Sequence, residues 1–320
     1  MAENILEVDH LTHYFKLNKK TRIKAIDGVS FQIRKHEILG IVGESGSGKS
    51  TLARCIMNIY KPSAGSIRFE GIETLDKSEF KANKKLLQTQ RQIIFQDSAS
   101  SLNQRMKTLD IISEPLKINH ITTPRKTARE EARFQLETVG LDESFLSRYP
   151  SQMSGGQRQR VAIARALTTE PDLLIADEPV AALDVSIQAQ IINLFKHLKE
   201  EHGFSILFIA HDLAMVEFLC DRVGVMYHGR LVEIADTKEL YANPIHPYTR
   251  MLLSAIPVPD PLAARARKHP DYSHMNFDTS GELVEVKKGH FVIMQPKTQI
   301  AADSVQALKG STDGGIQYHE

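Results

Sequence analysis

The sequence predicts an α/β fold with a mostly parallel core sheet, because patterns of buried strands alternate with patterns of helices. Short apolar runs bounded by glycine or acidic residues are typical of parallel strands that are covered on both faces. Such runs lie at 38–42, 173–176, 205–210 and 223–227. Helical patterns separate them, which favours a sheet with helices on its faces.

The composition is that of an ordinary globular protein, long enough for one large domain and an appendage. Of 320 residues, 42% are hydrophobic and 25% are charged. The net charge of +1 argues against a protein dedicated to wrapping nucleic acid. No apolar run approaches the ~20 residues that span a bilayer, and no apolar signal segment opens the chain. The two cysteines, Cys55 and Cys220, suit a reducing cytoplasm.

The N-terminal segment, at about 5–34, has the pattern of antiparallel strands. Apolar residues alternate with polar ones between Ile23 and Ile33, as in strands with one buried face. Asp27 and Gly28 are turn residues within this stretch. We therefore expect an antiparallel β subdomain ahead of the parallel core.

Two helical regions complete the domain that we place at 1–250. Residues from about 98 to 155 are charged and helical in pattern, and they predict an inserted helical subdomain. Apolar residues between Ile187 and Leu198 fall on one face of a helix, and Gly203 follows as a suitable C-cap.

The last part of the chain, 251–320, has the character of a small C-terminal extension. Prolines interrupt regular structure soon after residue 255, and the end is polar. Residues 282–286 and 290–294 could pair as a hairpin through the short segment between them. This tail contains no cysteine, so we expect no iron–sulfur cluster in it.

A phosphate-binding loop follows the strand at 38–42 and opens a helix. It fits the pattern G-x-x-x-x-G-K-[ST] through Gly43, Glu44, Ser45, Gly46, Ser47, Gly48, Lys49, Ser50 and Thr51. Glycines let the backbone curl so that several N–H groups face one point, and the helix N-terminus adds positive potential there. We expect Lys49 to reach the outer phosphates of ATP and Ser50 to hold Mg²⁺ by its hydroxyl.

Two acidic residues end the strand at 173–176. An acid at this end of a parallel strand lies beside the phosphate loop, where Asp177 can support hydrated Mg²⁺. Glu178 follows, and we expect it to orient or deprotonate the water that attacks the γ-phosphate. The alternative is that Asp177 and Glu178 are only a solvated acidic pair at a strand end. The phosphate loop earlier in the chain favours the catalytic interpretation.

Further motifs resemble those of ABC ATPases in order and spacing, over about residues 5–250. The resemblance implies a signature motif, a Q-loop glutamine that also contacts Mg²⁺, a D-loop aspartate and a switch histidine. These are Ser154-Gly155-Gly156-Gln157, Gln96, Asp184 and His211, respectively. The same resemblance assigns adenine stacking to Phe15, with Tyr14 as the alternative.

The signature segment is distant in sequence from the phosphate loop. Its two glycines before a helix start could offer N–H groups to an anion, as the phosphate loop does. The resemblance implies a head-to-tail dimer, in which the Ser154–Gln157 segment of one subunit completes the ATP site of the other. ATP would then hold two subunits together until it is hydrolysed.

Several stretches are similar to one subfamily, the ATPases of oligopeptide and dipeptide permeases. The most distinctive is Asn243-Pro244-Ile245-His246-Pro247-Tyr248-Thr249, just past the nucleotide-binding domain. The chain is most similar to the second, F-type, ATPase subunit of an oligopeptide permease. This resemblance implies ATP hydrolysis that powers import, most readily of peptides. A nickel or other small-solute importer, or a partner subunit that does not hydrolyse ATP, remains the alternative.

The resemblance also implies a set of partners and a location. They are a second, non-identical ATPase subunit, two transmembrane permease subunits and an external substrate-binding protein, with no nucleic acid. Permease subunits would hold this chain at the cytoplasmic face of the membrane. The transported substrate is not readable from the chain, because selectivity in this family belongs mainly to the binding protein and the permease.

Overall fold

An eight-stranded sheet forms the centre of the molecule, in the order β11-β12-β10-β9-β3-β8-β7-β6. The computed structural model describes residues 3–16, 18, 21–97, 101–121, 127–256, 277 and 279–294. The strands are β3 (Ile38–Val42), β6 (Arg91–Ile94), β7 (Leu173–Asp177), β8 (Ser205–Ala210), β9 (Arg222–Tyr227), β10 (Arg230–Asp236), β11 (Glu282–Lys287) and β12 (His290–Met294). The strands from β9 to β6 are parallel, and the remaining three are antiparallel. The four predicted parallel strands are therefore confirmed.

The parallel strands are apolar throughout because each faces two hydrophobic cores. Along β3, Ile38 and Val42 pack into the core beneath the helices of one face. Leu39 and Ile41 point the other way, into a core shared with α1 (Lys49–Ile56) and the N-terminal strands. Side chains alternate across a strand, so burial of both faces requires an unbroken apolar run.

The N-terminal residues form a separate antiparallel sheet, as predicted, in the order β2-β1-β4-β5. Its strands are β1 (Asn4–Lys16), β2 (Arg22–Arg34), β4 (Ala64–Phe69) and β5 (Ile72–Glu73). The expected turn at Asp27-Gly28 is wrong, because both residues lie inside β2. Gly28 has a φ of +70° and donates its N–H to the Thr12 hydroxyl at 3.1 Å, where the pairing with β1 shifts register. A bulge and a tight turn favour the same residue types, which explains the error.

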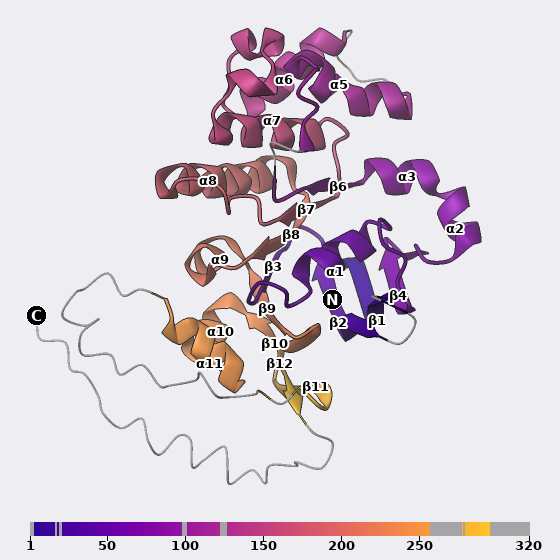
Figure 1. Cartoon of the computed structure of the whole chain (residues 1–320), viewed down its shortest axis with the longest axis vertical. Helices are drawn as coiled ribbons and strands as arrows, with labels where there is room; N and C mark the ends of the chain where they lie inside the picture. Colours follow the sequence, from indigo (N-terminus) through magenta and orange to yellow (C-terminus); the bar gives the residue numbers. More distant parts are fainter. Residues whose placement is uncertain are drawn as a thin grey trace, which may run out of the picture.

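Helices cover the sheet, and a group of them lies beyond one end of it (Figure 1). α5 (Thr108–Asn119), α6 (Ala128–Thr138) and α7 (Gly155–Leu167) gather at the top of that view, with short 3₁₀ turns at Glu143–Ser147 and Pro150–Gln152. These helices occupy the region predicted to be a helical insert. The remaining helices are α2 (Lys77–Ala82), α3 (Lys84–Thr89), α8 (Val185–His202), α9 (Leu213–Leu219), α10 (Thr237–Ala242) and α11 (Pro247–Ser254).

Gly203 ends α8 with a φ of +71°, which confirms the predicted C-cap. None of the helices in the described ranges is long and apolar enough to cross a membrane. Most of the C-terminal extension lies outside the described residues, and so does most of the segment in which we noted the prolines.

The C-terminal hairpin predicted at 282–294 is confirmed as β11 and β12. It does not stand apart as an appendage. β12 pairs antiparallel with β10, through Glu233 opposite Val292 and Ile234 opposite Phe291. The hairpin therefore continues the same sheet that carries the phosphate loop, at the opposite edge from β6.

Candidate nucleotide-binding site

The phosphate loop connects β3 to α1, as its sequence predicts. Gly48 is the N-cap of α1, so the first N–H groups of that helix open toward the loop. Ser47 donates its N–H to the Glu44 carbonyl at 3.2 Å and accepts one from Gly229 at 2.9 Å. The loop is thus curled and held against the turn between β9 and β10, with its N–H-rich side at a helix start.

Two of the loop glycines are required by close backbone contacts. A Cβ at Gly43 would lie 2.1 Å from the Met226 carbonyl oxygen, and one at Gly48 would lie 2.2 Å from that of Ala25. Both glycines also have positive φ, at +150° and +106°. Any larger residue at either position would push the loop away from β2 and β9.

Lys49 is buried at the base of the loop. Its Nζ donates to the carbonyl oxygens of Gly43 and Glu44, at 2.7 and 2.9 Å. Burial lowers the pKa of Lys49 below its ordinary value, although the carboxylates of Glu178, Asp177 and Glu44 act in the opposite direction. The ammonium group therefore sits where an additional anion would stabilise its charge.

Ser50 and Asp177 meet beside the loop. The Ser50 hydroxyl donates to Oδ1 of Asp177 at 2.8 Å, although α1 and β7 are far apart in sequence. Burial raises the pKa of the Asp177 carboxyl, while the Ser50 hydrogen bond and the charge of Arg54 oppose that rise. A hydroxyl and a carboxylate are hard oxygen donors of the kind that Mg²⁺ prefers, so these two residues fit a magnesium ion.

Three predicted residues converge on the carboxylate of Glu178. Gln96 Nε2 donates to Oε2 at 3.0 Å, His211 Nδ1 lies 3.5 Å from the same oxygen, and Lys49 Nζ lies 3.9 Å from Oε1. Glu178 has a φ of +47°, which is strained for a residue with a side chain. Its N–H donates to the Ile209 carbonyl at 3.0 Å, so β8 holds it in this conformation.

The predicted metal contact of Gln96 has no counterpart in the hydrogen bonds of this chain. Its amide nitrogen is turned to Glu178, and within the described residues no hydrogen bond joins Gln96 to Ser50 or Asp177. Gln96 lies two residues beyond the end of β6, which pairs with β7, and this position explains why it reaches Glu178.

The structure places the signature segment away from this group. Ser154 is the N-cap of α7, where its hydroxyl accepts the Gln157 N–H at 3.3 Å and its own N–H donates to the Gln157 side chain at 3.0 Å. In the described ranges no hydrogen bond or ion pair links Ser154–Gln157 to the phosphate loop, and α7 lies apart from α1 in Figure 1.

The two signature glycines lie within the first turn of α7. The prediction that they precede the helix is therefore wrong. They pack against the start of α8. A Cβ at Gly156 would lie 2.6 Å from Cγ2 of Ile187, and one at Gly155 would lie 3.1 Å from Cδ2 of Leu183. Asp184 lies between these two contacts as the exposed N-cap residue of α8.

Phe15 lies near the end of β1, with 37% of its surface exposed. Its ring packs edge-on against His13 at 4.7 Å and Tyr60 at 5.5 Å between centroids. It pairs across the sheet with Ile23, two residues before the Ala25 carbonyl that contacts Gly48. Tyr14 points differently and lies under Lys24 at 5.9 Å. Phe15 is therefore an exposed ring on a strand pair that reaches the loop, as adenine stacking requires.

Sequence reasoning missed one residue of the loop's surroundings. Tyr248, from α11, is fully buried, and its hydroxyl accepts the backbone N–H of Glu44 at 3.0 Å. The only signal in the sequence was that Tyr248 belongs to the distinctive segment at 243–249. No local pattern connects that segment with the phosphate loop.

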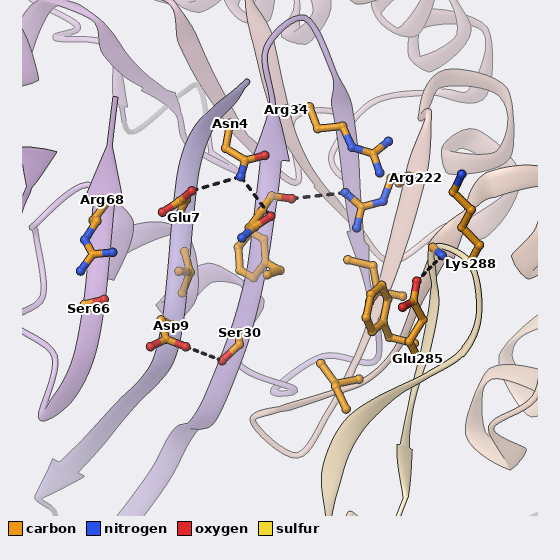
Figure 2. Close-up of a pocket in the computed structure, with 17 residues that line it drawn as sticks. Asn4, Glu7, Asp9, Ser30, Arg34, Ser66, Arg68, Arg222, Glu285 and Lys288 are labelled. Atoms are coloured by element: carbon orange, nitrogen blue, oxygen red, sulfur yellow. Dashed lines mark hydrogen bonds between the residues drawn. The ribbon is translucent and has the colours of Figure 1, made fainter. Parts of the chain in front are cut away.

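A separate cavity of about 700 Å³ lies between the C-terminal hairpin and the N-terminal sheet (Figure 2). Charged side chains of both signs line it, among them Glu7, Asp9, Arg68, Arg222 and Glu285. None of the residues predicted to bind or hydrolyse ATP belongs to its lining. The chemistry assigned above is therefore concentrated on the phosphate loop, and this cavity has no part in it.

Two family models match the chain. The model described as "ABC transporter" matches residues 26–181, and the model described as "Oligopeptide/dipeptide transporter, C-terminal region" matches residues 232–278. The first covers the phosphate loop, Gln96, the signature segment and Glu178. The second covers α10, α11 with Tyr248, and β10 from Val232 onward.

Similar proteins extend over nearly the whole chain. The oligopeptide transport ATP-binding protein OppF of Bacillus subtilis (strain 168) is 49% identical over 92% of this chain and 97% of its own length. The protein of the same name from Streptococcus mutans is 47% identical over 92% and 96%.

Solved structures of similar shape include a dimer of the ATP-binding cassette MJ0796 in a post-hydrolysis state, bound to ADP and Pi. It is 30% identical, with a TM-score of 0.65, and the match covers 72% of this chain and 98% of that one. The structure of cbiO1 from Clostridium perfringens, part of the ABC transporter complex cbiONQ, has the same identity and TM-score over 75% and 92%.

Proposed function

This chain belongs to the ABC transporter family, as an ATP-hydrolysing subunit of a peptide importer, and from that premise we propose how its residues carry out the work. The observation that supports the proposal most strongly is the convergence of Gln96, Lys49 and His211 on the Glu178 carboxylate. All four lie beside a loop whose N–H groups and helix N-terminus favour phosphate.

ATP binds with its phosphates in the curled loop of Gly43, Ser45, Gly46, Ser47, Gly48, Lys49, Ser50 and Thr51. Lys49 exchanges its bonds to loop carbonyls for the outer phosphates, whose charge offsets the burial that lowers its pKa. Adenine stacks on the exposed ring of Phe15. Ser50 and Asp177, with Gln96, would hold Mg²⁺, whose positive charge would offset the negative charge of the phosphates.

Glu178 is the base of the hydrolysis step. Its carboxylate takes a proton from a water molecule as the water oxygen bonds to the γ-phosphorus. The bond from that phosphorus to the bridging oxygen breaks, the electron pair stays on ADP, and inorganic phosphate leaves. Before hydrolysis, Gln96 holds the carboxylate by its hydrogen bond, and His211, 3.5 Å from the same oxygen, contacts the γ-phosphate. His211 then responds to the loss of that phosphate.

The other half of the site comes from a second ATPase subunit. Because Ser154–Gln157 makes no hydrogen bond or ion pair with its own phosphate loop in the described residues, we assign it to the ATP of a partner that faces it head to tail. Asp184, exposed beside the signature glycines, lies on the same face and contacts the partner. ABC cassettes work as dimers with permease subunits, and the partner ATPase here is a non-identical chain.

The complete importer includes two permease subunits that hold this chain at the cytoplasmic face and an external protein that delivers the substrate. The similarity to oligopeptide transport proteins along nearly the whole chain supports peptides as that substrate. Uptake of labelled oligopeptides, compared with nickel uptake, by the assembled importer separates the two substrate classes directly.

Replacement of one carboxylate tests the catalytic assignment. Glu178→Gln should leave ATP binding intact and reduce turnover by about 10²–10⁴-fold in the assembled transporter, because the amide cannot accept the proton. Phosphate release and binding of a fluorescent ATP analogue are the two measurements.

Glu170→Gln is the matched control. Glu170 is also a glutamate with positive φ, at +49°, but it is exposed at the end of α7, and its variant should hydrolyse normally. Turnover of Glu178→Gln at the wild-type rate would show that another group is the base.

A further inference from the structure

In the part of the chain that the structure describes, a buried hydroxyl of α11 contacts the phosphate loop. Tyr248 is 0% exposed, and its Oη accepts the Glu44 N–H at 3.0 Å. The Glu44 carbonyl accepts from Lys49 at 2.9 Å. One residue of the loop is therefore held on its N–H side by α11 and on its carbonyl side by the lysine that binds phosphate.

The ring of Tyr248 is fixed by its neighbours. Tyr227, at the end of β9, lies 4.3 Å away between centroids, and Phe277 lies 5.5 Å away. Burial raises the pKa of Tyr248 to about 12, so its hydroxyl stays neutral at physiological pH. A neutral hydroxyl in a packed aromatic cluster is a fixed acceptor for the loop N–H.

A buried ion pair holds the turn that carries Tyr248. Both oxygens of Glu233 accept backbone N–H groups from this turn, from Ile245 at 2.8 Å and from His246 at 3.0 Å. His246 Nδ1 in turn accepts the Tyr248 N–H at 3.2 Å. The oxygen of Glu233 that accepts from Ile245, Oε1, also lies 2.8 Å from His290 Nε2 of β12, and the side chains of Glu233 and His290 are 0% and 1% exposed.

We propose that Tyr248 is a positioning residue for ATP binding, which keeps the phosphate loop in its curled form, and that the Glu233–His290 pair fixes Tyr248 from the C-terminal hairpin. A continuous set of contacts thus leads from β12 through Glu233, the turn at 245–246 and Tyr248 to Glu44. This inference rests on the proposed function of the loop. It adds a role for the C-terminal hairpin in ATP binding that does not depend on contact with the nucleotide.

The expected loss of ATP affinity follows from the fraction of molecules in which the phosphate loop is curled. Loss of one neutral hydrogen bond changes an equilibrium by about three- to tenfold, and a loop that is curled less often binds ATP more weakly by that fraction. Tyr248 touches neither ATP nor the attacking water, so turnover at saturating ATP should change little. A rise in KM with an unchanged kcat is therefore the signature of positioning.

Tyr248→Phe tests this because it retains the ring and removes only the acceptor. We expect a Kd for a fluorescent ATP analogue, and a KM for ATP in the assembled transporter, that are about three- to tenfold higher than in the wild type. Hydrogen exchange of the peptide that contains Glu44 should become faster, while exchange in β8 and α8 stays unchanged. Equal KM and equal exchange in variant and wild type would overturn the proposal.

Tyr227→Phe is the matched control. It lies in the same aromatic cluster, and within the described residues its hydroxyl makes no hydrogen bond to the loop. Its KM should stay at the wild-type value, and an equal rise in both variants would assign the effect to the cluster and refute the role of the Tyr248 hydroxyl. Lys49→Ala distinguishes failure of the proposed ATP-binding function from failure of the role of Tyr248. If wild type and Lys49→Ala bind ATP equally, the proposed function fails, whatever Tyr248 does.

His290→Asn tests the remote end of the same contacts. It removes the partner of Glu233 without touching α11 or the loop, so faster exchange at Glu44 and a higher KM should both appear. A change in exchange that is confined to β11 and β12 would show that the hairpin does not act on the loop.

Discussion

Gly156 shows how a single residue joins two motifs. Its missing side chain lets the first turn of α7 lie against Ile187 on α8, three residues after Asp184. The signature segment and the start of α8 are therefore placed relative to each other by direct contact. Glycine here has a packing role in addition to any contact with nucleotide.

Gly156→Ala should lower the free energy of unfolding by about 1–2 kcal/mol, because overpacking against a β-branched side chain is costly. Alanine ordinarily stabilises a helix by about 1 kcal/mol relative to glycine, so the sign of the change is diagnostic. Urea denaturation without nucleotide measures it. Gly155→Ala is the comparison, since its Cβ would meet only the flexible end of Leu183, and it should be tolerated. A Gly156→Ala chain more stable than wild type by the full helix gain of about 1 kcal/mol would exclude this packing role.

At the scale of elements, a histidine that can change its charge with pH holds the C-terminal hairpin against β10 and α10. His290 lies between Glu233 of β10 and Glu239 of α10, and Lys287 of β11 pairs with that second carboxylate at 2.7 Å. Burial acts to lower the pKa of His290, but the hydrogen bond and charge of Glu233, aided by Glu239, raise it above its ordinary value.

A raised pKa makes the docked hairpin sensitive to alkaline conditions. The stabilisation from protonated His290 is fully present below its unfolded pKa of about 6.5 and is lost as pH rises through the higher folded value. Thermal unfolding from pH 6 upward should therefore show a decline in wild type that is smaller in His290→Asn. His197→Asn removes a largely exposed histidine of α8 and should keep the wild-type slope. Parallel curves for wild type and His290→Asn would contradict the assignment.

Elements were predictable where burial imposes a simple pattern. β3, β7, β8 and β9 are apolar because both faces are covered, and Asp177 and Glu178 fall beside the loop because parallel strands end at one edge. β10 was not predicted, since the buried Glu233 interrupts its apolar run. The contact between Tyr248 and Glu44 joins distant parts of the chain, so only the assembled fold reveals it.

At the scale of the whole molecule, the proposed function gives each chain one half of each of two ATP sites. The phosphate loop and Glu178 form one group, and the N-terminus of α7 presents the other. A site completed only by a second chain makes ATP a ligand of the dimer, which it stabilises by mass action.

Mg-ATP should therefore drive dimer formation when hydrolysis is blocked. Glu178→Gln, mixed with its partner ATPase, should sediment as a dimer with Mg-ATP and as separate chains with Mg-ADP. Adding Lys49→Ala to the same chain should abolish the ATP effect, because it removes the buried ammonium group at the base of the loop. Persistent monomers at saturating ATP would contradict the shared site.

The pairing of β10 with β12 also has a consequence for biosynthesis. β10 ends at Asp236, whereas its neighbour begins only at His290, so the ribosome releases one edge of the sheet well before it makes the strand that covers it. During that interval the nascent chain exposes unpaired backbone groups, which is the condition under which strands of different chains join. The β10 edge can be paired only after β11 and β12 have been synthesised.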